Sequence, residues 1–175
     1  MRMSSPEQSR YDDLLHKYIQ PLRRLAWAYA PDRTECDDLL QEIALALWTA
    51  LPRFRGESSE RTWLYRIAHN TGISYVISRK RRTSRESSAP VITEPASNSR
   101  SPEAEAIERE KQQHLWTAIR ELPLTDRQVI VLYLEGMSAG EIEAVTGLTS
   151  GSIATRLTRI RHLLTARLRG EETPA

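Results

Sequence analysis

A stretch rich in serine and proline divides this chain of 175 residues into two short parts. Residues 83–100, TSRESSAPVITEPASNSR, hold five serines and two prolines and show no helical apolar period. They are therefore predicted to form a flexible linker. The remaining modules, residues 8–82 and 101–169, are each small, so each is expected to be a compact unit with a modest core. We expect two small domains rather than one large one.

The first module has the apolar spacing of helices. Between residues 11 and 30, leucine, tyrosine and alanine recur every three or four positions, which predicts a helix with a kink or break at Pro21. A second helix is predicted over residues 34–51. Thr34 and Asp37 resemble a capping box at its start.

A third helix of this module is predicted to begin at Ser59, as its cap, and to run to about Arg79. Its apolar face includes Trp63, whose place between other apolar residues favours packing in the core over stacking on a nucleic-acid base. Gly72 lies inside the helix, where glycine costs about 1 kcal/mol relative to alanine. That cost indicates tight packing against another element.

The second module is also predicted to be helical throughout. Ser101, followed by proline, predicts the start of a helix that reaches Leu122. Thr125 and Gln128 have the spacing of a capping box and predict a short helix after it. No segment of the chain alternates convincingly as a strand, so the predicted fold class is all-α: two small helical domains joined by a flexible linker.

The end of this module has the pattern of a helix-turn-helix. Ser138 and Glu141 match a capping box, and Gly147 follows the short helix in a tight turn. A last helix is predicted from about Ser150. Its apolar residues form one stripe, made of Ile153, Leu157, Ile160, Leu164 and Leu168.

The opposite side of this last helix is polar and basic. At 100° per residue, Ser152, Thr155 and Arg159 lie away from the apolar stripe, and Arg156 lies on its shoulder. In a helix-turn-helix the second helix enters the major groove, where arginine suits the paired acceptors of guanine. The pattern therefore predicts DNA binding. The alternative is a packed helical hairpin whose arginines only keep it soluble.

Positive charge is concentrated in two blocks. Residues 53–85 hold nine basic and two acidic groups, and residues 150–169 hold five arginines and no acid. Acidic chain separates them, although the net charge is only +2. Two basic blocks favour two contacts with a polyanion, the alternative being two solvated arginine faces.

Several other classes of protein are not supported by the sequence. No apolar run approaches the ~20 residues that cross a bilayer, and the N-terminus lacks the pattern of a secretory signal, so a soluble cytoplasmic protein without membrane insertion is expected. The single cysteine, Cys36, cannot form an internal disulfide or a cysteine-based zinc site. The four histidines are scattered and no HExxH occurs, so no metal site, cofactor or enzymatic activity is predicted.

The chain resembles the extracytoplasmic-function (ECF) sigma factors, promoter-specificity subunits of bacterial RNA polymerase. DDLLQEIALALW (37–48) and FRGESSERTWLYRIAHN (54–70) match the first conserved domain of this family. LPLTDRQVIVLYLEGMSAGEIEAVTGLTSGSIATRLTRIRHLL (122–164) matches its second. The block TWLYRIAHNT looks particularly like the envelope-stress branch. The resemblance implies that residues 8–82 correspond to sigma region 2 and residues 101–169 to region 4.

The family implies contacts for the first module. The predicted helix 34–51 would dock on the clamp helices of the largest subunit of core RNA polymerase. The residues that match the family's contact stretch are Asp37, Asp38, Gln41 and Glu42. Helix capping alone would also explain the first two, because acids near a helix N-terminus favour the dipole.

The family also implies two contacts with promoter DNA. A pocket for an unstacked base of the −10 element would be formed by Arg55, Gly56, Glu57, Ser58, Ser59 and Asn70. Phosphates beyond it would be held by Arg79, Lys80, Arg81 and Arg82. The −35 element would be read as duplex by Ser152, Thr155, Arg156 and Arg159.

Three positions depart from the family pattern, namely Ser74, Ile77 and Ala154, where Asp, Arg and a basic residue are frequent. They suggest a promoter sequence particular to this protein. Membership would also imply an anti-sigma factor, often membrane-bound. Cys36 stands beside two acids that disfavour a thiolate, so a structural role is favoured over redox sensing.

Two other functions are weighed against a sigma factor. In a stand-alone helix-turn-helix regulator, residues 8–82 would serve for dimerisation or sensing, which leaves the basic block 53–82 unexplained. A DNA-processing enzyme would need a nucleophile or a carboxylate cluster with metal-binding spacing, and the acids instead stand mostly at helix starts. Binding to core polymerase separates the first alternative from a sigma factor, and magnesium-dependent nuclease activity would revive the second.

Overall fold

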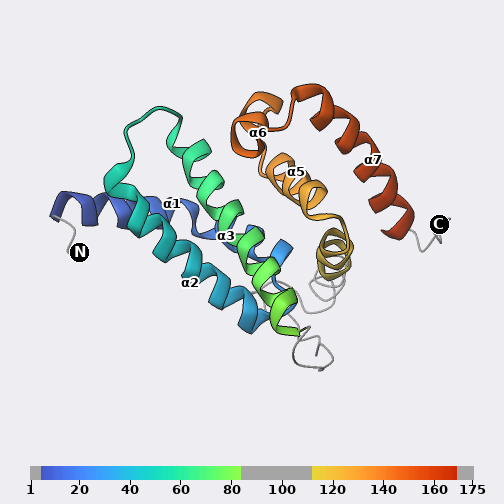
Figure 1. Cartoon of the computed structure of the whole chain (residues 1–175), viewed down its shortest axis with the longest axis horizontal. Coiled ribbons are helices and arrows are strands. Elements are labelled where there is room, and N and C mark those ends of the chain that lie inside the picture. The colour runs from blue at the N-terminus through green and yellow to red at the C-terminus, as the bar shows by residue number, and fades with distance from the viewer. Residues whose placement is uncertain (1–4, 84–111, 169–175) are drawn as a thin grey trace, which may run out of the picture. The chain divides into compact units, whose positions relative to one another are not determined.

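The computed structural model describes residues 5–83 and 112–168, and every regular element in these ranges is a helix (Figure 1). The chain divides into two compact units. Helices α1 to α3 form the body of the first, and the helices that follow residue 112 form the second. The all-α, two-part prediction is therefore confirmed. The predicted linker 83–100 lies outside the described residues, except for Thr83.

The N-terminal unit consists of α1 (Ser5–Tyr29), α2 (Arg33–Ala50), the short 3-10 helix η1 (Leu51–Arg53) and α3 (Glu60–Thr83). Its core lies between the apolar faces of these helices, as the three- and four-residue spacing predicted. The side chains without exposed surface include Leu22, Leu25, Leu39, Ile43, Leu47 and Leu64.

Two details of this unit differ from the sequence predictions. Of the kink or break predicted at Pro21, the break is wrong, because α1 runs through this residue. Tyr18 and Leu22, on either side of the proline, are both buried, so packing holds the helix together despite the hydrogen bond that proline removes. The capping box at Thr34 is also wrong. The turn after α1 is short, and α2 begins at Arg33, one residue before the predicted start. Thr34 therefore lies inside the helix and is not its N-cap.

The start of α3 is as predicted. The backbone N–H of Thr62 donates to the Ser59 hydroxyl oxygen at 3.1 Å, which caps the helix. The helix continues to Thr83, beyond the predicted end near Arg79. Its last turn is basic, and cations at a helix C-terminus are favoured by the dipole.

The tight packing predicted at Gly72 is confirmed. A Cβ atom placed there would lie 2.7 Å from Cδ2 of Tyr29, whose ring is buried. Only a residue without a side chain lets α1 and α3 approach this closely.

The C-terminal unit consists of a helical segment over residues 112–120, α5 (Leu124–Leu134), α6 (Ala139–Thr146) and α7 (Ser150–Leu168). The predicted start of the first helix, at Ser101, lies outside the described residues. The core side chains with no exposed surface are Ile119, Val129, Val131, Leu132, Ile153 and Ile160.

The capping box predicted at Thr125 is wrong. The helix α5 begins one residue before it, and the N-cap position is Pro123, which makes no side-chain cap. The guanidinium group of Arg127 instead donates to the carbonyl oxygens of Arg120 and Leu122, the latter at 3.1 Å. These bonds occupy carbonyl groups at the end of the preceding helix and stabilise the turn.

None of the helices in the described ranges has the length and apolar character needed to cross a lipid bilayer.

Candidate nucleic-acid interface

The turn between α6 and α7 is built by local hydrogen bonds. Ser138 and Glu141 form the predicted capping box, in which the Ser138 N–H donates to the Glu141 carboxylate at 2.8 Å. Gly147 ends α6 with a φ of 74°, a left-handed conformation that glycine adopts without strain. Ser150, the first residue of α7, hydrogen-bonds back to Glu143 at 2.5 Å. The turn of the predicted helix-turn-helix is thus held from both sides.

Helix α7 separates its apolar and polar faces as predicted. Ile153, Ile160 and Leu164 are buried, whereas Leu168 at the end of the stripe is half exposed. A shallow hollow of about 330 Å³ lies on the polar side. Its lining contains all four residues predicted to read DNA, together with Gly151: Ser152, Thr155, Arg156 and Arg159.

One residue of this site was missed by the sequence reasoning. Asp126, in the first turn of α5, is buried, with 1% of its side chain exposed, and its carboxylate binds both Arg156 and Arg159. The pair with Arg156 joins Nη1 and Oδ1 at 2.5 Å, and Nη2 of Arg159 contacts the other oxygen, Oδ2. An acid in the first turn of a helix is usually explained by the helix dipole. Asp126 is also at least thirty residues away from both arginines in the sequence. The sequence therefore carried no signal for this contact.

The loop between η1 and α3 lies exposed on the N-terminal unit. Gly56 has a φ of 76°, so the chain reverses there in a conformation that favours glycine. Beside the loop, the rings of Phe54 and Trp63 pack with centroids 4.8 Å apart. Trp63 is only half-buried, so it does not belong to the core as predicted, although its ring packs against Phe54. Of the predicted pocket residues here, Arg55, Gly56, Glu57 and Ser59 are exposed and Ser58 is half-buried.

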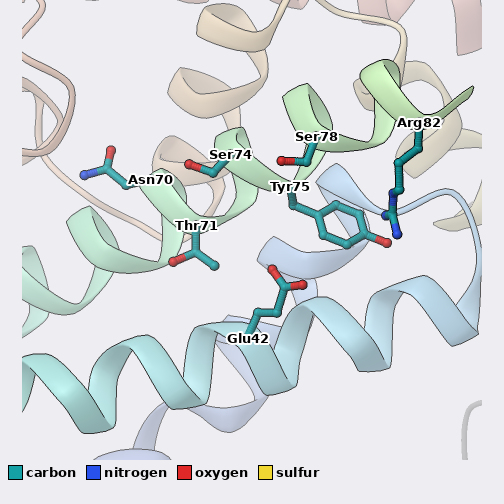
Figure 2. Close-up of a pocket in the computed structure, with 7 residues that line it drawn as sticks. All are labelled: Glu42, Asn70, Thr71, Ser74, Tyr75, Ser78 and Arg82. Carbon is teal, nitrogen blue, oxygen red and sulfur yellow. The ribbon is translucent and has the colours of Figure 1, made fainter. Parts of the chain in front are cut away.

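Asn70 lines two grooves of the N-terminal unit. One, of about 630 Å³, also contains Arg53 and Trp63 next to this loop. The other, of about 550 Å³, lies between α2 and α3, where Glu42 projects from α2 toward α3 (Figure 2). The other lining residues are Thr71, Ser74, Tyr75, Ser78 and Arg82. The structure thus brings together one predicted base-binding residue and one predicted polymerase-binding residue.

The basic run at the end of α3 is not uniform. The guanidinium group of Arg79 is paired with Glu35 of α2, with Nε 2.8 Å from Oε2. The Tyr75 hydroxyl donates to the same carboxylate at 2.7 Å, and burial together with Glu35 raises the pKa of that phenol. Lys80, Arg81 and Arg82 are exposed. Arg79 therefore joins two helices, whereas Arg82 lines the groove of Asn70.

The predicted polymerase-binding residues lie on the surface of α2. Asp37, Asp38, Gln41 and Glu42 are all exposed, whereas Cys36 beside them is buried. The Cys36 thiol lies 3.9 Å from the backbone oxygen of Arg23, against α1. Burial fits the structural role favoured for this cysteine.

The three departures from the family pattern are all on the surface. Ser74, Ile77 and Ala154 are exposed, and Ser74 lines the groove of Asn70. In residues 5–83 and 112–168, no group of three His, Cys, Asp or Glu side chains is placed to hold a metal ion.

Both units of the chain resemble known proteins. The family described as Sigma-70 region 2 matches residues 14–82, and the family described as Sigma-70, region 4 matches residues 112–164. The ECF RNA polymerase sigma-E factor of Escherichia coli K12 is 31% identical over 173 residues, which cover 93% of this chain and 88% of that protein. The chain belongs to the ECF RNA polymerase sigma factors. It therefore binds core RNA polymerase and directs promoter-specific initiation of transcription, and its family is not one of catalytic enzymes.

Other sigma factors resemble the chain over similar lengths. The sigma-E factor of Haemophilus influenzae is 28% identical, over 93% of this chain and 89% of that protein. Among solved structures, CnrH in complex with the cytosolic domain of CnrY has a TM-score of 0.66 at 25% identity, over 94% of this chain and 91% of CnrH. The sigma factor RpoE from Bartonella quintana, solved with the anti-sigma factor NepR, has a TM-score of 0.74 at 21% identity, over 93% and 99% of the two chains. The last match concerns the fold alone.

Proposed function

We propose that α7 of this sigma factor reads the −35 element as duplex DNA, with its polar face in the major groove. The observation that carries the proposal is the hollow on α7, where Arg156 and Arg159 lie beside Ser152 and Thr155 behind a well-capped turn. Arginine forks suit the O6 and N7 acceptors of guanine, and hydroxyl groups suit phosphates or either kind of base. At least one guanine in the −35 element is therefore expected.

The N-terminal unit is proposed to open and hold the −10 element. The exposed loop 55–59 and Asn70 offer backbone groups, hydroxyls and an amide, which can bind the Watson–Crick edge of an extruded base. Lys80, Arg81 and Arg82 are exposed beyond them and can hold phosphates. Because Arg79 is paired with Glu35, its contribution to phosphate binding should be smaller.

The face of α2 that carries Asp37, Asp38, Gln41 and Glu42 is proposed to dock on the clamp helices of the largest polymerase subunit. Glu42 lines the same groove as Asn70, so this docking surface would adjoin the site for the extruded base (Figure 2). Such an arrangement would couple polymerase binding to strand opening. Changing Gln41 and Glu42 together should weaken association with core polymerase and leave the helical content intact.

The protein is further proposed to act in the cytoplasm without catalytic activity of its own, and to be held inactive by an anti-sigma factor. Bond formation would belong to the polymerase, because the sigma factors are not a family of catalytic enzymes. An anti-sigma factor is supported by the fold shared with RpoE, whose structure contains NepR. It would cover the DNA-binding and polymerase-binding faces of the two units.

Run-off transcription tests the proposed function. Purified core polymerase and the full chain should yield a transcript of defined start from a matched promoter, for which the region upstream of the protein's own gene is one candidate. Arg159→Ala should lower discrimination at one −35 position by about 1–3 kcal/mol. Equal loss on every promoter would instead make Arg159 a phosphate contact. Tight binding of promoter duplex without core polymerase would favour a stand-alone regulator.

A further inference from the structure

The buried carboxylate of Asp126 bridges two side chains of the proposed reading face. Arg156 and Arg159 lie three positions apart on α7, and each binds a different oxygen of the carboxylate. The exposed fractions of the two arginine side chains are 31% and 57%, against 1% for Asp126. The acid therefore lies behind the arginines, between α5 and the surface that would meet DNA.

Each of these contacts occupies one terminal nitrogen of a guanidinium group. Arg156 uses Nη1, and its Nε also lies 3.4 Å from the Ser152 hydroxyl, while Arg159 uses Nη2. A guanidinium group has five N–H donors in a rigid plane. The remaining donors of each plane can still meet the paired acceptors of a base, and the ion pair fixes the direction in which they point.

We propose that Asp126 is a positioning residue for −35 recognition, which holds the planes of Arg156 and Arg159 ready for base edges. This inference rests on the proposed reading of the −35 element by α7. An arginine that is oriented before binding loses less conformational freedom when it meets the correct base. The carboxylate also opposes indiscriminate binding, because it partly neutralises two positive charges near the DNA phosphates. Asp126 thus favours discrimination over affinity.

A simple clasp between α5 and α7 is the competing explanation. Buried ion pairs are weak evidence for stability, because desolvation offsets much of the attraction between the charges. A clasp would act on the fold, and its loss would weaken binding to all duplexes equally. A positioning residue would act on the difference between correct and incorrect sequences.

The substitution Asp126→Asn separates these explanations, because asparagine keeps the shape and removes the charge. We expect the full chain, bound to core polymerase, to discriminate about tenfold less against a promoter with one wrong −35 base pair. Affinity for duplex lacking a −35 element should not fall, and its dependence on salt should steepen by up to about one in the slope of log affinity against log salt. Glu121→Gln is the matched control. Glu121 lies outside α7, and its Oε2 is 3.2 Å from Nη1 of Arg167 on that helix. The substitution removes the same charge from an exposed ion pair and should leave discrimination unchanged.

Two results would overturn the inference alone: undiminished discrimination by Asp126→Asn, or an equal loss of affinity for every duplex. If the wild-type protein itself showed no −35 preference, the proposed reading by α7 would fail and this inference with it.

A second measurement covers the case in which Asp126→Asn does not fold. Side-chain NMR of the wild type should show restricted guanidinium rotation for Arg156 and Arg159, assigned by Arg→Lys variants at each position. Freely rotating guanidinium groups in the folded wild type would contradict the positioning role.

Discussion

The hydroxyl of Tyr29 on α1 lies 2.7 Å from Nδ1 of His69 on α3, and both side chains are buried. The ring of Tyr29 also covers Gly72, one turn further along α3. The other ring nitrogen of His69, Nε2, is buried without a hydrogen-bond partner. This contact joins the first and third helices next to Asn70, so it supports the region proposed to hold the extruded base.

Gly72→Ala should destabilise the N-terminal unit. The added methyl group would lie 2.7 Å from a buried ring, and overpacking of this kind costs about 1–3 kcal/mol, of which the better helix propensity of alanine returns up to about 1 kcal/mol. Urea unfolding followed by circular dichroism measures the change. Gly140→Ala is the control: apart from its chain neighbours and the backbone of its own helix, nothing lies within 4 Å of its added Cβ, so that variant should be as stable as the wild type or more so. Unchanged stability of Gly72→Ala would contradict the close packing.

Stability of the N-terminal unit should fall in mild acid because of His69. Burial lowers the pKa of His69 from 6.5 to about 3. Between pH 6.5 and pH 3, His69 binds a proton in the unfolded chain but not in the folded chain. The contribution of neutral His69 to the free energy of unfolding is therefore complete above pH 6.5 and is lost as the pH falls toward 3. The unfolding free energy should therefore decrease progressively as the pH is lowered from 7 to 5. Unfolding in urea at pH 7, 6 and 5 measures it.

The variant His69→Gln tests the assignment, because glutamine does not titrate. Its unfolding free energy should change less between pH 7 and 5 than that of the wild type, whatever its absolute stability. His16→Gln, at an exposed position of the same unit, is the control and should keep the wild-type dependence. The same pH dependence in His69→Gln as in the wild type would assign the effect to another group.

Arg79 and Arg81 should differ in what they contribute, although they belong to one basic run. Arg79→Ala breaks the contact with Glu35 and should cost up to about 1 kcal/mol of stability, since the pair is partly exposed. Arg81→Ala should leave unfolding unchanged and reduce the salt dependence of promoter binding by about one phosphate contact. Urea unfolding and binding at several salt concentrations check the two effects. The reverse pattern would show that the ion pair does not persist in solution.

Ser138→Ala should destabilise the C-terminal unit by about 1 kcal/mol, because it removes the cap of α6. Thr125→Ala is the matched control. Thr125 has the same sequence pattern but lies inside α5, so no cap is lost and a smaller change is expected. Amide hydrogen exchange of α6 and α5 measures both. Equal costs for the two substitutions would mean that the α6 cap contributes nothing particular.

Capping signals show how far the sequence could predict this structure. The caps at Ser59 and Ser138 depend on neighbours three residues away, so the local pattern is sufficient. At Thr125 the same pattern misled, because the long side chain of Arg127 reaches back to the preceding turn and the helix begins at another residue. Local patterns predicted the helices and the apolar core, whereas they could not show which competing contact prevails.

The candidate sites were predictable to different degrees. Four residues of the α7 hollow could be assigned to one face from helical periodicity alone. The ion pairs of Asp126 and of Glu35 could not, since thirty or more residues separate the partners and no periodicity relates them. The groove shared by Glu42 and Asn70 likewise depends on how α2 and α3 pack. The sequence did not predict which charged side chains pair in the folded structure. That pairing determines which basic side chains can bind DNA.

Asn70→Ala should impair strand opening more than it impairs the first binding of duplex. The side chain is exposed on α3 and lines an open groove, so its removal leaves no cavity in the core and the fold should persist. If the amide binds an extruded −10 base, its loss withdraws free energy only after the base has left the stack, where unstacking costs a few kcal/mol. The rate of opening, followed by a fluorescent base analogue within the −10 element, should fall severalfold while the affinity of the closed complex stays within about twofold.

Ser78→Ala, in the same groove two turns further along α3, is the control for a general loss of polar contact. Normal opening by Asn70→Ala on a matched promoter would remove Asn70 from the base-binding site and leave the exposed loop as the remaining candidate.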